Sequence, residues 1–77
     1  MMMGMITKVK VELVDGEVIE YIDDSNKDIK DVCKFFMKNM NKNKSIYIHR
    51  IKNGIREGFV FNCRNIKKVH VRRELIW

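Results

Sequence analysis

Residues 29–40 carry apolar side chains at the spacing of one face of an α-helix. They fall at i, i+3, i+4, i+7, i+8 and i+11, a pattern that a helix turns toward a core. The members of this apolar stripe are Ile29, Val32, Cys33, Phe36, Met37 and Met40. Before the stripe stands Asp23-Asp24-Ser25, and we expect Ser25 to be the N-cap, with Asp28 as its capping-box partner three residues on. We interpret the two aspartates and Cys33 as capping and packing residues rather than as a catalytic site.

Residues 6–14 alternate between apolar and charged side chains, which predicts a half-buried strand. Asp15-Gly16 follows as a turn, and the length of its loop sets the register of the hairpin. A two-residue loop would mix apolar and charged groups on both faces, whereas a three-residue loop with Gly16 in the left-handed conformation separates them. The three-residue loop is therefore our prediction. It pairs Val11 with Ile19, Val9 with Tyr21, and Lys10 with Glu20.

A second hairpin is predicted around Asn53-Gly54, which calls for a two-residue type I′ turn between strands at 45–52 and 55–62. On the core face it pairs Ile48 with Phe59, Ile46 with Phe61, and Arg50 with Glu57. On the opposite face it pairs Tyr47 with Val60, His49 with Gly58, and Ile51 with Arg56. Gly58 within a strand indicates either a bulge or the close approach of another group. Asn62–Asn65 is expected to turn, with Asn62 as an Asx cap, into a last strand at 66–73.

These elements predict an α+β fold. We expect one small antiparallel sheet of about five strands, in the order ββαβββ, covered on one face by a single amphipathic helix. Residues 1–5 are expected to be a disordered lead-in and residues 6–77 to form a single α+β domain. Helix-turn-helix proteins need two adjacent helices, and RNA-recognition motifs need a second helix, so neither module fits this order.

Composition restricts the classes of function. The longest uninterrupted apolar run is three residues, so we expect no membrane segment and a cytoplasmic protein. Cys33 and Cys63 are thirty residues apart without a CxxC motif, as unpaired thiols in a reducing compartment are. With His49 and His70 they lack the close ligand pairs of zinc sites, so we predict neither a metal nor a cofactor. Phosphate loops and nucleophile motifs are also missing, and we predict that the protein is not an enzyme.

Charge is divided unevenly along the chain. Residues 1–31 carry a net charge of −4 and residues 32–77 a net charge of +10. The most basic stretch, 62–73, has five basic residues and no acid. In a strand, Lys68, His70 and Arg72 would form a positive row on one face, about 6.7 Å apart. The predicted anion-binding residues are Arg64, Lys67, Lys68, His70, Arg72, Arg73 and Arg56, and the predicted stacking residues are Tyr47 and His49.

Two functions remain open at this stage. The first is a small, non-enzymatic basic binding module that engages nucleic acid or an anionic nucleotide through its last strand and open sheet face. The alternative is a phage or mobile-element accessory or inhibitor protein that docks on a host protein, with homo-oligomer formation as an option. The tail Leu75, Ile76 and Trp77 would be its exposed anchor, unless it folds back to close the core. A third interpretation of the basic face is simply that a solvated sheet face carries charge.

Overall fold

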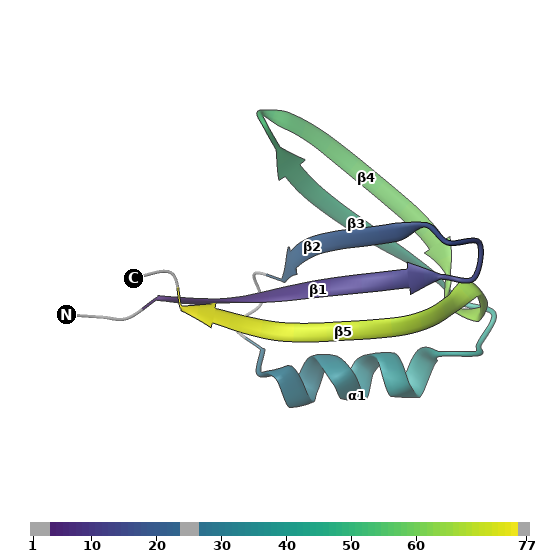
Figure 1. Ribbon diagram of the computed structural model, residues 1–77. Coiled ribbons are helices and arrows are strands. Elements are labelled where there is room, and N and C mark those ends of the chain that lie inside the picture. Colours follow the sequence, from purple (N-terminus) through teal and green to yellow (C-terminus); the bar gives the residue numbers. More distant parts are fainter. Residues whose placement is uncertain (1–3, 24–26, 76–77) are drawn as a thin grey trace.

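A computed structural model describes residues 4–23 and 27–75 of the chain. This part contains one α-helix and two antiparallel sheets, of three and two strands (Figure 1). Along the chain the elements are β1 (Met5–Leu13), β2 (Val18–Asp23), α1 (Ile29–Asn39), β3 (Ser45–Lys52), β4 (Ile55–Asn62), a short 3-10 turn (Cys63–Asn65) and β5 (Ile66–Leu75). The α+β class and the antiparallel pairing are confirmed.

The prediction of one five-stranded sheet is wrong. The strand order is β2-β1-β5 in the first sheet, and β3 and β4 form a second sheet of their own. Between β2 and β3 the described residues share no backbone hydrogen bond, and the hairpin of β3 and β4 diverges from the first sheet (Figure 1). Hairpin contacts are local and can be inferred from turn chemistry, whereas the meeting of β2 with β3 depends on tertiary packing.

Both predicted hairpin registers are confirmed. In the first, Val11 pairs with Ile19 and Lys10 with Glu20, around a loop in which Gly16 has a φ of 93°. In the second, Asn53 and Gly54 have φ values of 53° and 77°, as the type I′ turn requires. All six predicted pairs between β3 and β4 are present.

Helix α1 begins later than predicted. Asp28 is its N-cap, and the carboxylate accepts a hydrogen bond from the Ile29 backbone N–H at 2.9 Å. The expected N-cap, Ser25, lies outside the described residues. Asp28, predicted as the partner of the cap, is therefore the cap itself.

The buried face of α1 is narrower than the predicted stripe. It consists of Val32, Phe36 and Asn39, whereas Met37 is 77% exposed and Ile29 is also exposed. The helix packs mainly along β5 and covers only a narrow strip of a three-stranded sheet (Figure 1). A stripe of six apolar residues is wider than that strip, so its outer members remain in solvent.

The core lies between α1 and the sheet formed by β1, β2 and β5. β1 is the central strand, and its Val9 and Val11 are almost completely buried. The other buried apolar residues are Leu13, Ile19, Val32, Phe36, Ile48, Phe61, Cys63 and Ile66. The hairpin of β3 and β4 thus contributes to this core mainly through Ile48 and Phe61, in the half of the hairpin that is farther from its turn.

The connection into β5 follows the prediction. The Asn62 side chain accepts a hydrogen bond from the Arg64 backbone N–H at 2.9 Å, which is the expected Asx cap. β5 then pairs with β1 and continues to Leu75, two residues beyond the predicted end. A register shift between Glu12 and Leu13 leaves Lys67 without a partner residue on β1.

Candidate functional site

The predicted basic row lies on the face of the first sheet that turns away from α1. Lys68, His70 and Arg72 are exposed along β5, while Val69 and Val71 between them pack against the core. Because β5 pairs with β1, Lys10 lies opposite His70 and Lys8 lies opposite Arg72. The single row predicted from the sequence is therefore a double row.

A groove of about 650 Å³ lies between this open face and the second half of β3. It is lined by five cationic residues and one carboxylate: Lys8, Lys10, Arg50, Lys52, Arg72 and Glu20. His49 and His70 add two imidazoles to the lining, and Ile22 and Ile51 add apolar surface. An open hollow with this excess of positive charge concentrates anions near it.

Acidic side chains from outside the basic stretch neutralise part of the double row. The Glu74 carboxylate lies 3.0 Å from Lys8 Nζ and 3.0 Å from Arg72 Nε. The hydrogen bond from Lys8 and the charges of Lys8 and Arg72 lower the pKa of Glu74 against the opposing effect of desolvation. Glu12 lies 3.9 Å from Lys67. The last strand is thus less free of acids than residues 62–73 suggest.

Of the seven predicted anion-binding residues, only His70 and Arg72 line the groove. Lys68 lies next to it along β5, and Arg56 is on the hairpin. Arg64 belongs to the 3-10 turn, Lys67 is the residue at the register shift, and Arg73 is on the face of β5 that α1 covers. Arg73 Nη1 lies 3.9 Å from the Asp28 carboxylate, and its Nε is buried without a hydrogen-bond partner among the described residues. Adjacent residues of a strand point to opposite faces, so Arg72 and Arg73 cannot serve the same surface.

The predicted stacking residues share the outer face of the hairpin with Arg56. Arg56 Nε donates a hydrogen bond to His49 Nε2 at 3.3 Å. The Tyr47 ring lies over Gly58: a Cβ at residue 58 would be only 3.1 Å from Tyr47 Cε1. The close-approach interpretation of Gly58 is therefore confirmed, and the continuous register excludes the bulge.

Sequence reasoning placed no binding role on Lys8, Lys10, Arg50 or Lys52, which line the groove. Lys10 lies on the charged side of the alternating first strand, but β1 and β5 come from opposite ends of the chain. Their pairing brings the lysines of β1 beside the basic strand, and no local sequence pattern predicts that long-range contact. An alternating strand with lysines on its polar side was the available signal.

Leu75, the first residue of the predicted interaction tail, does not line the groove. Leu75 is 54% exposed, and Ile76 and Trp77 lie outside the described residues. Cys33 and Cys63 are free thiols, the second fully buried. Within residues 4–23 and 27–75, no group of three His, Cys, Asp or Glu side chains could hold a metal ion. The helix in this part of the chain is too short and too polar to cross a membrane.

Comparison with protein-family models, with curated proteins and with solved structures finds no match to this chain. Its function must therefore be argued from its own residues and their geometry.

Proposed function

We propose that the protein is a non-enzymatic binding module that holds a single strand of nucleic acid across the groove between the open face of the first sheet and β3. The observation that carries the proposal is the double row of cations on β1 and β5, which faces the basic second half of β3. Cations on both sides of a groove can contact successive phosphates of one strand.

Three lysines at this surface are available to phosphates. Lys10 and Lys52 line the groove, and Lys68 is exposed next along β5. None of the three makes an ion pair with another residue of the described part of the chain. Lys8, Arg72 and Arg50, by contrast, already share the carboxylates of Glu74 and Glu57. We therefore assign the main electrostatic contribution to Lys10, Lys52 and Lys68.

The hairpin supplies surfaces on which a base could stack. Tyr47 is 66% exposed, and its ring lies over the backbone of Gly58, where no side chain stands in its way. The imidazole of His49 and the guanidinium of Arg56 lie on the same face of the hairpin. Bases stack on aromatic rings and on guanidinium planes without regard to sequence. This combination favours binding of an unpaired strand over a duplex.

Salt dependence tests the proposal. If Lys10, Lys52 and Lys68 each neutralise one phosphate, the slope of log affinity for oligo-dT against log salt should be about −0.7 × 3, or roughly −2. Lys10→Ala should make the slope shallower by about 0.7. Tyr47→Ala should cost about 1–3 kcal/mol of binding free energy and leave the slope unchanged, because stacking releases no counterions.

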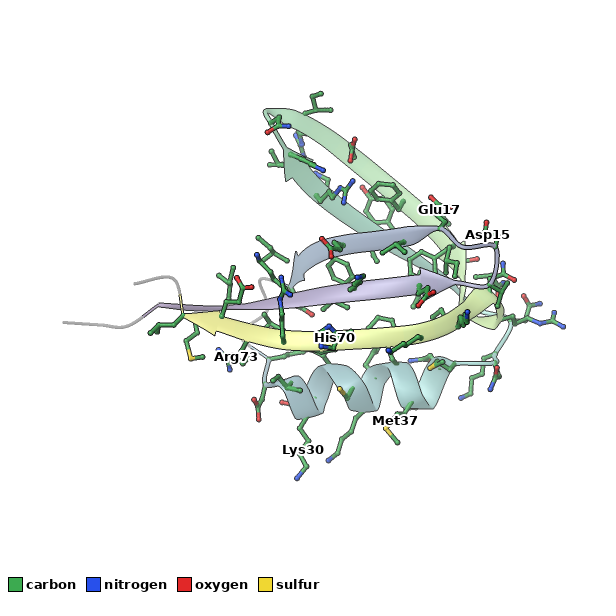
Figure 2. All side chains as sticks on the ribbon, in the orientation of Figure 1. Asp15, Glu17, Lys30, Met37, His70 and Arg73 are labelled. Carbon is green, nitrogen blue, oxygen red and sulfur yellow. The ribbon has the colours of Figure 1, made fainter. Side chains whose placement is uncertain are left out.

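Lys30→Ala is the matched control. Lys30 is exposed on the outer side of α1, away from the groove, and its removal changes the net charge equally (Figure 2). Equal effects of Lys10→Ala and Lys30→Ala would show that only net charge matters. A mononucleotide that saturates at one per chain with a shallower slope would identify a nucleotide as the ligand. The absence of any binding at low salt, where such contacts are strongest, would contradict the proposal.

Docking on a host protein, with or without self-association, is the second candidate. It is supported by the apolar side chains on the outer face of the hairpin, where Tyr47, Ile51 and Val60 are all more than 60% exposed. Exposed apolar groups gathered on one sheet face are typical of protein interfaces.

A further inference from the structure

β2 and β3 are neighbouring strands that do not pair. α1 connects them, both run in the same direction, and they separate toward their C-terminal ends (Figure 1). No backbone hydrogen bond joins them in the described part of the chain. Each strand therefore presents an open edge to the other, and unpaired strand edges are templates for a further strand.

The backbone groups that face this split can be identified. Glu17 C=O accepts a hydrogen bond from Leu13 N–H of β1 at 2.8 Å. The backbone N–H and C=O groups of the odd-numbered residues of β2 therefore point toward β1. Glu20 C=O accepts a hydrogen bond from Arg50 Nη1 at 2.8 Å, so the even-numbered residues point toward β3. The N–H and C=O groups of Glu20 and Ile22 consequently line the split.

A cavity lies on each side of the split. The basic groove is on the side away from α1, and a second cavity of about 390 Å³ is on the side of α1. Tyr21, Ile22 and His49 line both cavities, which places the two hollows on either side of the same pair of strand edges. The lining of the second cavity includes the apolar side chains of Phe35, Phe36, Val32, Ile46 and Ile48, together with the charged residues Asp23 and Lys27.

We propose that the split between β2 and β3 is a docking slot for an extended segment of a partner protein that alternates acidic and apolar residues. The segment would enter as a strand antiparallel to both β2 and β3 and would join the two sheets into one. A strand between the two parallel strands of a β-α-β unit is the arrangement of split β-α-β folds. This inference goes beyond nucleic-acid binding and does not depend on it.

The chemistry of the two cavities determines the chemistry of the partner. Successive side chains of a strand point to opposite faces, so every second residue of the segment would enter the cavity beside α1, whose lining includes Val32, Phe35 and Ile46. The residues between them would face the basic groove, where Lys10 and Lys52 have no ion pair with another described residue. Charge complementarity therefore selects acidic side chains on that face, while main-chain hydrogen bonds supply affinity along the edges.

Arg50 now occupies the place of the missing strand. Its Nη1 satisfies the Glu20 carbonyl, its Nε lies 2.9 Å from the Glu57 carboxylate, and its guanidinium lies over the Phe59 ring at 4.8 Å. A docked segment can take over the Glu20 carbonyl with its own N–H, while Arg50 keeps its contacts with Glu57 and Phe59 on its own hairpin. Entry of a strand therefore exchanges one hydrogen bond for several.

A fluorescein-labelled heptapeptide that alternates glutamate with leucine and isoleucine is a suitable probe for fluorescence anisotropy with the intact protein. We expect saturable binding at one peptide per chain. The same peptide, N-methylated at the residues facing β2, should bind at least about ten-fold more weakly, because its N–H groups can no longer pair. A peptide of equal composition, with its glutamates in one block, should lose a similar factor. Equally tight binding of either control would overturn the proposal.

Two protein variants locate the site. Phe35→Ala removes a 40% exposed ring from the cavity beside α1 and should weaken peptide binding several-fold. Its matched control is Met37→Ala, which removes an exposed side chain two residues on that points away from the slot and should change nothing (Figure 2). Ile22→Pro removes an N–H from the β2 edge and should abolish binding; if this variant does not fold, the N-methylated peptide still decides.

Oligo-dT binding is measured on the same variants. Phe35→Ala should leave it unchanged, whereas Lys10→Ala should weaken both ligands. Binding of oligo-dT without any binding of the alternating peptide would overturn the docking slot and leave the proposed function intact. Binding of the peptide without any binding of oligo-dT would support the docking slot and overturn the proposed nucleic-acid binding.

Discussion

Single residues differ sharply in how much they contribute to the core, even when they are neighbours on the same helix. Phe36 is 2% exposed and belongs to the core, whereas Met37 beside it is almost free in solvent. Both belong to the apolar stripe of the sequence. The distinction depends on how α1 is rotated about its own axis against the sheet, and it can be tested directly.

Phe36→Ala should destabilise the protein by about 3–5 kcal/mol, because the substitution removes a buried aromatic ring and leaves a cavity. For a domain of this size that is a large part of the total free energy of unfolding. Met37→Ala should change the free energy of unfolding by less than about 0.5 kcal/mol. Urea unfolding followed by circular dichroism measures both, and similar values for the two variants would show that α1 is rotated relative to the structure.

A second residue-scale prediction concerns Tyr21 on β2. Burial, with a smaller contribution from the charge of Asp23, raises the pKa of Tyr21 to about 12. The unfolded chain loses the phenol proton near pH 10, while the folded chain retains it, so the unfolded state binds fewer protons between about pH 10 and 12. Stability should therefore fall as the pH rises through this range. Tyr21→Phe should remove this component of the pH dependence; an unchanged slope would place the phenol in water.

At the scale of elements, both hairpins are closed by residues in the left-handed conformation. In the second hairpin a Cβ at Gly54 would meet no atom within 4 Å, so only the backbone φ of 77° restricts that position. The turn must match the twist of β3 and β4 for their cross-strand pairs to form. The residues of the turn therefore determine the pairing of β3 and β4 in the half of the hairpin next to the turn, which has few contacts with the rest of the fold.

Gly54→Ala should destabilise the protein by about 1–2 kcal/mol, because an L-residue with a Cβ is strained in the left-handed region. Gly54→Asn should cost less, since asparagine adopts this conformation more readily. Thermal unfolding of the two variants measures the difference. Equal losses would mean that the turn does not require a positive φ at residue 54.

At the scale of the whole molecule, acidic and basic segments are joined by pairing between the two ends of the chain. β1 and β5 bring Glu12 to Lys67 and Lys8 to Glu74, and the start of α1 brings Asp28 to Arg73. Part of the charge difference between the two halves of the chain is thus neutralised by ion pairs within the fold. In the groove, Lys10 and Lys52 make no ion pair with another described residue.

Glu74→Gln should therefore increase the affinity for oligo-dT, because Lys8 and Arg72 lose the carboxylate that they share. The salt slope should become steeper by about 0.7 for each cation released. Glu17→Gln is the matched control: it removes the same charge from the loop between β1 and β2, where Glu17 makes no ion pair with the described residues (Figure 2). Equal gains in the two variants would attribute the effect to net charge alone.

Local features of the sequence determined the elements of this protein. Asp15-Gly16 and Asn53-Gly54 specify turn types, and each turn type together with the alternation of its strands permits one register that separates apolar from charged side chains. Asn62 likewise specifies the turn into β5, because its side chain accepts a hydrogen bond from the Arg64 backbone N–H. These interactions act over a few residues, so the pattern itself contains the information.

Only the tertiary structure decided how the elements meet. The pairing of β5 with β1 places Lys8 and Lys10 in the groove, turns Arg73 toward α1 and brings Glu74 to two of the predicted cations. The open split between β2 and β3, and the burial of Phe36 but not Met37, have the same origin. Such contacts join residues far apart in the chain, and they depend on how several apolar faces fill one core together, a condition that no single stretch of sequence expresses.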